Sequence, residues 1–307
     1  MDNIVIIGSS NTDMIIKMSR IPKPGETILG GDFSIAPGGK GANQAVGAAR
    51  AGGNVTFIAR VGDDMFGKQS VEGFESDGIN TENIITDSAA PSGVALIFVD
   101  DAGENSIAVA SGANANLLPS DIESSRDAIA SAGIVLMQLE IPLESVRAAV
   151  EIAAEGGAKV ILNPAPAQPL DDDILRNLSI ITPNETEAEM LTGIKVEDEQ
   201  GAEKAADMLL SKGIDTVIIT LGSRGVYVAG PDFRGMVPAF SVTAEDTTAA
   251  GDVFNGVLAV ALAEKMPMVE ALRFSNAAAA LSVTKLGAQT SAPYRADIET
   301  FLKERTS

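Results

Sequence analysis

The sequence of 307 residues contains no cysteine and no histidine. The lack of cysteine excludes disulfides, thiolate nucleophiles and cysteine-ligated zinc sites. The lack of histidine excludes a Ser-His-Asp triad and a histidine-ligated metal. Any general base must therefore be supplied by Asp, Glu, Lys or Tyr.

Basic residues are also scarce, because 22 Lys and Arg face 42 Asp and Glu, giving a formal net charge of −20. A surface with this charge repels phosphate backbones and anionic membranes, so we expect no nucleic-acid partner and no membrane partner. We interpret it as a solvated surface of a soluble protein. An anionic ligand would need backbone amides, a few cations or metal ions close by to balance its charge.

Long hydrophobic runs are missing as well. The first residues lead into a short apolar run at 4–7 without the basic segment and apolar core of a signal peptide. No run approaches the ~20 residues that span a bilayer. We therefore expect a cytoplasmic protein. The hydrophobic fraction of 45% allows a sizeable core, and the absence of linker-like tracts predicts one α/β domain over residues 1–307.

The middle of the chain alternates strand and helix patterns. Predicted strands are residues 4–7, 55–61, 134–139, 159–162, 180–181 and 216–221. Predicted helices are residues 42–51, 65–76, 143–154, 174–178, 187–191, 202–210, 253–262 and 269–285. This alternation predicts a doubly wound, mainly parallel sheet with helices on both faces.

One stretch, residues 14–35, has no helical period and contains Pro22, Pro24 and Gly25. The β-rich segments 93–99 and 105–110 are joined by a turn. Together these segments are typical either of a small β element outside the main sheet, or of a long surface loop and a hairpin. The residues alone leave both alternatives open.

The strongest chemical motif is residues 246–256, DTTAAGDVFNG. Small residues at 249–251 lead into an apolar helix, whose first amides have no intrahelical partner and attract anions. Asp252 lies in the first turn, where a carboxylate can accept the proton of a hydroxyl nucleophile while the amides stabilise a transferring phosphoryl group. Asp252 could alternatively only complement the helix dipole. The whole motif favours the catalytic interpretation.

A second motif is residues 38–45, GGKGANQA. It is not a P-loop, because Gly41 follows Lys40 where Ser or Thr is required, and Ser34 occupies the position of the first glycine. Paired glycines before a helix allow the backbone to approach a polar ligand closely. Asn43, one turn into the helix, can hydrogen-bond a sugar hydroxyl. The alternative is a glycine-rich helix entry.

Polar residues also follow two predicted strands. Asn11 and Asp13 come after the first strand, and Glu140 follows strand 134–139. Ligands of open α/β sheets bind at the carboxyl ends of strands, so these side chains can hold the hydroxyls of a polyol. Taken by itself, the tripeptide at 11–13 is explained more simply by an ordinary turn.

Two further polar segments also follow the ends of predicted strands. Asn184 and Glu187 lie three residues apart at a helix start, where they can organise the hydration shell of a magnesium ion or form a capping box. Residues 220–225, TLGSRG, can carry nucleotide phosphates on their amides or form a plain β-turn. Neither segment is decisive by itself.

Together, the motifs at 38–45 and 246–256 resemble those of the phosphofructokinase-B family of carbohydrate kinases, and within it the branch that phosphorylates D-ribose. The resemblance extends from Gly8 to Gln289. It implies transfer of the ATP γ-phosphoryl group to the 5-hydroxyl of D-ribose. Asp252 would then be the catalytic base, and Ala249, Ala250 and Gly251 would form the anion hole.

The resemblance also implies roles for the other positions. The sugar would be bound by Asn11, Asp13, Gly39, Lys40, Asn43 and Glu140. ATP would be bound by Asn184, Thr220, Leu221, Gly222, Ser223, Arg224, Gly225, Gly251 and Asn276, with Glu187 in the phosphate and Mg²⁺ region. A monovalent cation, K⁺, would be bound by Asp246, Thr248, Ser282, Lys285, Gly287 and Ser291, mostly through backbone carbonyls. A β lid, about residues 12–36 and 91–111, would close over the sugar and form a homodimer contact.

Other functions stay open from the residues alone. A related kinase would act on deoxyribose, fructose, a nucleoside or a sugar acid, and a non-catalytic protein of the same fold would only bind sugar. The hydroxyl-binding set favours a small sugar, and an aromatic content of 4% disfavours a stacked nucleoside. The intact motif around Asp252 disfavours the non-catalytic alternative. The segment 8–11, GSSN, lacks the glycine spacing of a dinucleotide-binding oxidoreductase.

Overall fold

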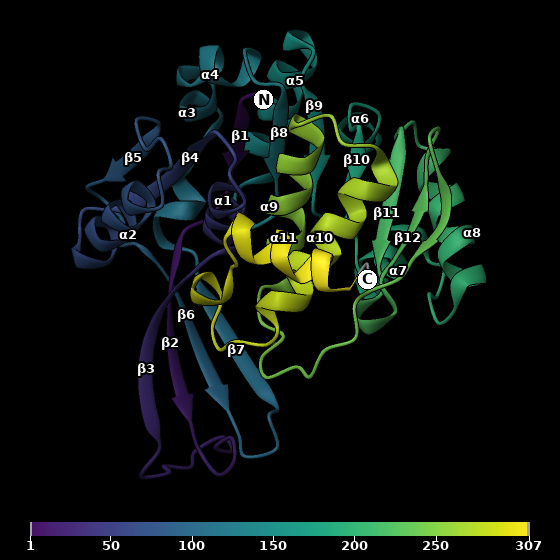
Figure 1. Ribbon diagram of the computed structural model, residues 1–307. Coiled ribbons are helices and arrows are strands. Elements are labelled where there is room, and N and C mark those ends of the chain that lie inside the picture. The colour runs from purple at the N-terminus through teal and green to yellow at the C-terminus, as the bar shows by residue number, and fades with distance from the viewer. Residues whose placement is uncertain (1, 306–307) are drawn as a thin grey trace.

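Nine strands form one sheet in the computed structural model, which describes residues 2–305 (Figure 1). Their order is β13-β12-β11-β10-β9-β8-β1-β4-β5. The strands are β1 (Ile4–Ile7), β4 (Val55–Gly62), β5 (Ile84–Asp87), β8 (Ile134–Met137), β9 (Lys159–Leu162), β10 (Ile180–Ile181), β11 (Thr216–Thr220), β12 (Val226–Ala229) and β13 (Arg234–Val237). Neighbours from β5 to β11 run parallel, whereas β11, β12 and β13 pair antiparallel. The predicted mainly parallel sheet is confirmed, and β5, β12 and β13 were not predicted.

Helices cover both faces of this sheet (Figure 1). One face is covered by α1 (Lys40–Arg50), α2 (Met65–Ser76), α9 (Ala250–Ala263), α10 (Met268–Ser282) and α11 (Arg295–Glu304). The other is covered by α3 (Pro119–Ser124), α4 (Arg126–Ala130), α5 (Leu143–Gly156), α6 (Asp172–Leu175), α7 (Glu185–Thr192) and α8 (Glu199–Leu210). Alternation along β1 sends Ile4 and Ile6 into one core and Val5 and Ile7 into the other. This two-sided burial explains why the strands are continuous apolar runs.

Helices α1 and α9 pack with their backbones in close contact. A Cβ atom added to Gly256 of α9 would lie 2.4 Å from the carbonyl oxygen of Gln44 and 2.9 Å from the amide nitrogen of Ala48, both in α1. All residues of α9 from Asp252 to Ala263 are buried, so this helix lies inside the protein. Within residues 2–305, no helix combines the length and the apolar character needed to cross a bilayer.

The remaining strands form a separate sheet of four, in the order β3-β2-β6-β7, which projects from the body (Figure 1). They are β2 (Asn11–Lys17), β3 (Asp32–Gly38), β6 (Gly93–Val99) and β7 (Asn105–Ala110). Of the two alternatives left open for residues 14–35, the structure therefore has the small β element. Residues 11–13 lie inside β2 and not in a turn, because they pair with both β3 and β6.

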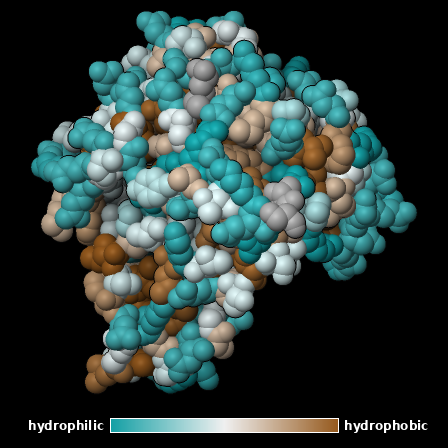
Figure 2. Space-filling model, in the orientation of Figure 1, coloured by the Kyte–Doolittle hydropathy of each residue, from teal (hydrophilic) through white to brown (hydrophobic). Residues whose placement is uncertain are grey.

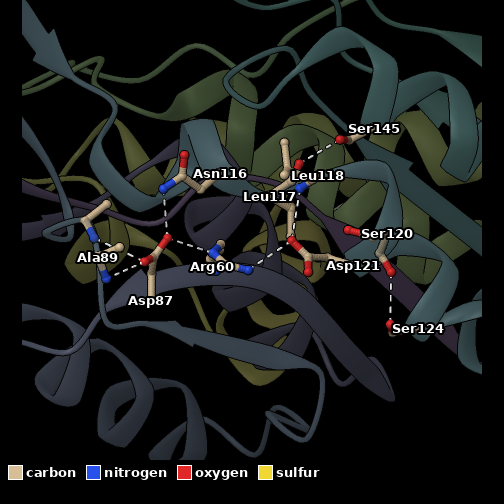
Figure 3. Close-up of polar contacts among 11 residues, drawn as sticks. Arg60, Asp87, Ala89, Asn116, Leu117, Leu118, Ser120, Asp121, Ser124 and Ser145 are labelled. Atoms are coloured by element: carbon tan, nitrogen blue, oxygen red, sulfur yellow. Dashed lines mark hydrogen bonds and ion pairs between the residues drawn. The ribbon is translucent and has the colours of Figure 1, made fainter.

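A buried carboxylate ties the base of this small sheet to the body (Figure 3). Asp87, at the end of β5, accepts hydrogen bonds from Arg60 Nε at 2.8 Å, from Asn116 Nδ2 at 2.9 Å and from the Ala89 amide at 2.8 Å. Hydrogen bonds from Asn116 and Arg60 hold the pKa of Asp87 well below its usual range. Since Ala89 precedes β6 and Asn116 ends the 3₁₀ helix η1 (Gly112–Asn116) after β7, both ends of the β6–β7 hairpin are held.

Large apolar side chains gather on the projecting sheet and its loop (Figure 2). They are Leu29, Phe33, Ile35, Leu96, Ile107 and Val109, each at least 46% exposed. An exposed apolar cluster of this kind is uncommon on a monomer and indicates a contact surface.

We expect the substitution Gly256→Ala to lower the free energy of unfolding by about 1–3 kcal/mol, because its methyl group would overlap the backbone of α1. Gly47→Ala is the matched control at the same interface. Its methyl group would lie 3.4 Å from Val253 Cα, a normal contact, so its effect should stay below about 1 kcal/mol. Urea denaturation measures both, and equal losses would contradict the close approach described above.

Candidate active site

Asp252 lies in the first turn of α9, as predicted, and its side chain is only 5% exposed. Its Oδ2 atom accepts a hydrogen bond from Asn43 Nδ2 at 3.0 Å, and its Oδ1 atom accepts one from Gln44 Nε2 at 3.1 Å. Asp252 also lines a cavity of about 620 Å³. The two sequence motifs thus meet at this carboxylate.

Burial makes Asp252 a stronger proton acceptor than an exposed carboxylate. Burial raises the pKa of Asp252, while the Lys40 charge and the hydrogen bonds from Asn43 and Gln44 oppose the increase. In return, the Asp252 charge raises the pKa of Lys40 despite burial of the ammonium group. A carboxylate whose pKa is raised toward neutrality is better matched to general-base catalysis.

The small residues before Asp252 line the same cavity. Ala249 is the N-cap of α9 and adopts a left-handed conformation with φ of 58°, and Ala250 and Gly251 open the helix. A Cβ atom added to Gly251 would meet no atom of residues 2–305 within 4 Å. Packing therefore does not require glycine here. The Ala250 amide donates a long hydrogen bond of 3.4 Å to the Thr247 carbonyl. Amides at a helix start beside open space are suited to binding an anion.

The glycine pair of the second motif approaches β2 closely. A Cβ atom on Gly38 would lie 2.3 Å from the carboxylate oxygens of Asp13, and one on Gly39 would lie 2.7 Å from the Asn11 amide nitrogen. Gly39 also has a φ of 89°, which favours glycine. The pair thus brings the start of α1 next to the two polar residues of β2.

Glu140, which follows β8, contacts the start of α1 as well. It accepts hydrogen bonds from the Ser9 hydroxyl and, at 3.0 Å, from the Lys40 amide. Asn11 accepts a hydrogen bond from Asn114 Nδ2 at 2.8 Å. Asn11 and Glu140 line a second cavity of about 380 Å³, whereas Lys40 lines the larger one. Of the predicted sugar-binding residues, these three thus border a cavity, whereas Asp13, Gly39 and Asn43 line neither of the two.

Two members of this group, Asp13 and Asn43, are acceptors whose burial is unfavourable without a ligand. Burial, together with the charges of Glu140 and Asp252, raises the pKa of Asp13 to about 6. The Oδ1 atom of Asn43 is buried and has no hydrogen-bond partner among residues 2–305. Unpaired buried acceptors cost free energy, so a ligand with several hydroxyl groups fits this site.

The larger cavity also brings together most of the predicted nucleotide residues. Its lining includes Asn184, Glu187, Thr220, Gly222, Ser223, Gly225 and Asn276. Leu221 and Arg224 do not line it. Leu221 is buried in the core, and the Arg224 guanidinium group donates to Glu185 Oε1 at 3.1 Å and to the Glu197 carbonyl at 2.8 Å. The segment 222–224 is a 3₁₀ helix, η2 (Gly222–Arg224), and not a plain β-turn.

Asn184 and Glu187 form the capping box that was one of the two alternatives. The Glu187 amide donates to Asn184 Oδ1 at 2.8 Å, and the Asn184 amide donates to Glu187 Oε2 at 2.9 Å. Burial raises the pKa of Glu187, which faces the same cavity. Residues 2–305 contain no group of three or more Asp or Glu side chains arranged around a metal. A magnesium ion that keeps several waters does not need such a group, so the residues fit that ion.

The predicted monovalent-cation residues lie in two adjacent segments. The Asp246 carboxylate accepts hydrogen bonds from the Thr248 and Gly287 amides, both at 2.9 Å. Partial burial opposes ionisation, but these hydrogen bonds lower the pKa of Asp246. The other predicted members are Ser282, Lys285 and Ser291, in or shortly after the end of α10. Carbonyl and carboxylate oxygens are donors that suit a hard cation.

Sequence reasoning missed several polar residues around the site. They are Ser9, Gln44, Asn114, Asn163, Thr182 and Asn255, together with the apolar cavity residues Phe240, Val242 and Val283. Gln44 belongs to the second motif, but nothing in the sequence indicates its contact with a residue 208 positions later. Phe240 and Val242 lie in a segment without a recognisable pattern, whereas Val283 lies in the predicted helix 269–285, where its apolar character indicated only core packing.

A carboxylate beside an anion-binding helix start and a hydroxyl-binding pocket defines a kinase that phosphorylates a small polyol. Residues 1–295 match the family described as pfkB family carbohydrate kinase, and the chain belongs to this family. The ribokinase of Haemophilus influenzae is 50% identical over 300 residues, covering 98% of both chains.

Solved structures of ribokinases are similar to this chain over nearly its whole length. A Thermotoga maritima ribokinase is 41% identical with a TM-score of 0.90, covering 99% of this chain and 100% of that chain. An Arabidopsis thaliana ribokinase complexed with ribose and ATP is 32% identical with a TM-score of 0.91, covering 98% and 99%. These likenesses confirm the predicted family and fold.

We expect Gly251→Ala to separate stability from activity. Its methyl group would enter the open space of the cavity, so unfolding free energy should stay the same or rise by about 0.5–1 kcal/mol from better helix propensity. The kinase turnover number should fall at least about tenfold, because the methyl group occupies the anion site. Gly73→Ala, in α2 and equally free of contacts, is the matched control and should keep full activity. Full activity of Gly251→Ala would contradict the anion hole.

Proposed function

We propose that this protein catalyses the ATP-dependent phosphorylation of D-ribose at its 5-hydroxyl, giving ribose 5-phosphate and ADP. The observation that carries the proposal is the buried Asp252 carboxylate, placed between the open helix start of α9 and the polar residues of β2 and α1. The high identity to ribokinases over the whole chain supports D-ribose as the acceptor.

In the proposed reaction, Asp252 accepts the proton of the 5-hydroxyl as the sugar oxygen attacks the γ-phosphorus of ATP in line. The bond from the γ-phosphorus to the β–γ bridging oxygen breaks, and ADP leaves. The amides of Ala249, Ala250 and Gly251 stabilise the negative charge of the transferring group. The Lys40 ammonium group adds positive charge beside the carboxylate that gains the proton.

The other hydroxyl groups of the sugar are assigned to the polar set that includes residues bordering both cavities. This set is Asn11, Asp13, Gly39, Lys40, Asn43 and Glu140. The unpaired Asn43 Oδ1 atom supports the assignment, since a sugar hydroxyl would supply its missing donor. The Asp13 carboxylate can accept hydrogen bonds from two hydroxyl groups when it is ionised.

The nucleotide is assigned to the larger cavity, with Asn184, Asn276 and the segment 220–225 as its binding residues. Glu187 would hold Mg²⁺ through water, and the ion would supply charge neutralisation for the phosphates. Asp246, Thr248, Ser282, Lys285, Gly287 and Ser291 would hold K⁺ beside the anion hole. The hydrogen bonds that join Asp246 to Thr248 and Gly287 support this assignment, because they bring the two segments together.

The small sheet is assigned the role of a lid, as part of a single kinase domain. Its closure over the sugar would exclude water and limit hydrolysis of ATP. We also expect a homodimer in which a second copy covers the apolar side chains of this sheet, which their exposure supports. A cytoplasmic location and the lack of nucleic-acid and membrane partners remain predictions from composition.

ADP release over a panel of acceptors, with and without K⁺, tests the proposal. The panel consists of D-ribose, 2-deoxy-D-ribose, D-fructose, a nucleoside and a sugar acid. D-Ribose should be the best acceptor. Asp252→Asn should still bind D-ribose in calorimetry but lose roughly 10²–10⁴-fold in turnover, because the base that accepts the proton is removed.

Each result has a separate meaning. Near-normal turnover of Asp252→Asn would refute the assigned base. A better acceptor than D-ribose would refute the sugar specificity while leaving the kinase activity in place. Binding of D-ribose without ADP release from any acceptor would favour a non-catalytic sugar-binding protein.

We expect D-ribose to bind more weakly as the pH falls from 7 to 5. Asp13 has a pKa of about 6, so it is mostly ionised at pH 7 and mostly protonated at pH 5. If only the ionised form binds tightly, the affinity measured by calorimetry without nucleotide should fall roughly tenfold. Asp13→Asn should bind weakly at both pH values. A pH-independent affinity of the unsubstituted protein would contradict the role of Asp13.

A further inference from the structure

Gln44 lies at the junction of three buried polar side chains and is itself completely buried. Its Nε2 atom donates to Asp252 Oδ1 and to Asn163 Oδ1, both at 3.1 Å. Its Oε1 atom accepts a hydrogen bond from Gln138 Nε2. Both ends of its amide group are therefore used, and the proposed reaction assigns this residue no role.

The Asp252 carboxylate is held at both oxygens by consecutive residues of α1. Asn43 donates to Oδ2 and Gln44 donates to Oδ1. The terminal torsion of an aspartate has broad, roughly two-fold preferences, so a carboxylate held at one oxygen retains rotational freedom. We propose that Gln44 is a positioning residue, which fixes the plane of the Asp252 carboxylate for proton transfer from the acceptor hydroxyl. This inference rests on Asp252 being the base.

The same hydrogen-bond chain reaches the anion-hole segment. Asn163 Nδ2 donates to the Thr182 carbonyl at 3.1 Å, and the Thr182 hydroxyl donates to Asn255 Oδ1 at 2.6 Å. Asn255 Nδ2 then donates to the Gly251 carbonyl at 2.8 Å. Gln44 thus belongs to a series of hydrogen bonds that connects the proposed base to the backbone of the proposed anion hole. The series returns to Asp252 because Gly251 is its neighbour in the chain.

The Asp252 carboxylate itself determines which way the Gln44 amide points, because an ionised carboxylate only accepts hydrogen bonds and so requires Gln44 Nε2. With Gln44 Nε2 directed at Asp252, Gln44 Oε1 is left to accept the hydrogen bond from Gln138 Nε2. The Oε1 atom of Gln138 is pressed against the backbone of Gly8, where an added Cβ atom would lie only 2.0 Å away, and has no partner among residues 2–305. Gln138 acts on the carboxylate only through Gln44 and provides a matched control.

The hydrogen bond from Gln44 also has an electrostatic consequence. Burial raises the pKa of Asp252, the Lys40 charge and the hydrogen bonds from Asn43 and Gln44 lower it, and the Glu140 charge raises it. Asp13 and Glu187 are further carboxylates coupled to Asp252. Removing the Gln44 donor takes away a hydrogen bond that favours the charged form of Asp252, so the pKa of Asp252 should rise. The acid limb of the plot of turnover number against pH should therefore move to higher pH.

The test compares Gln44→Met with Gln138→Met, which both delete one buried amide and the hydrogen bond between residues 44 and 138. For Gln44→Met we expect turnover to fall about ten- to a hundredfold, with both KM values within about threefold of the original, because the lost geometry affects the reacting groups and not ligand binding. The acid limb should move to higher pH. For Gln138→Met the loss should be smaller and the limb unmoved, since Gln44 can still reach Asp252.

The double variant should be no worse than Gln44→Met alone, because Gln138 acts through Gln44. Normal turnover of Gln44→Met would overturn the inference. An equal loss and an equal pH shift in both single variants would overturn it too, since packing would then be the cause. Should Gln44→Met not fold, Gln44→Leu also removes the donor with a different apolar shape, and wild-type turnover in that variant would overturn the inference. If Asp252→Asn is inactive and Gln44→Met is normal, only the positioning role of Gln44 is rejected. If Asp252→Asn is active, the assignment of Asp252 as the base is rejected as well.

Discussion

The contact between α1 and α9 is the constraint on which the site depends. Because Gly256 has no side chain, the backbone of α9 lies against the Gln44 carbonyl, and the two helices start side by side. This contact brings Asn43 and Gln44 to the Asp252 carboxylate across more than two hundred positions of sequence. Since α9 is buried from Asp252 to Ala263, the carboxylate is also removed from water, which raises its pKa.

The site concentrates negative charge in a protein that is already acidic. Asp13, Glu187 and Asp252 all have raised pKa values, chiefly because of burial, while the positive charge of Lys40 opposes the increase at Asp252. Clustered carboxylates with raised pKa values are typical of functional sites. An ATP molecule in this cavity would gain little from side-chain cations, so backbone amides and bound metal ions would carry most of the charge compensation.

The small sheet and the sugar site form one structural unit. Asn11 and Asp13 open β2, which pairs with β3 and β6, so the proposed sugar-binding residues are the first residues of the projecting sheet. At its base, Asp87 holds the β6–β7 hairpin to the body through Asn116 and the Ala89 amide. Any movement of this sheet relative to the body would therefore be transmitted directly to the residues proposed to hold the sugar.

Local patterns in the sequence predicted the parallel sheet, its flanking helices and the position of Asp252 in a first helical turn. These features follow from apolar runs, periodicity and helix-start chemistry, which are properties of neighbouring residues. The choice between loop and strand for residues 14–35, the role of Gln44 and the apolar lining of the nucleotide cavity did not follow. Strand pairing and side-chain contacts join residues far apart in the chain, so only the tertiary structure decided them.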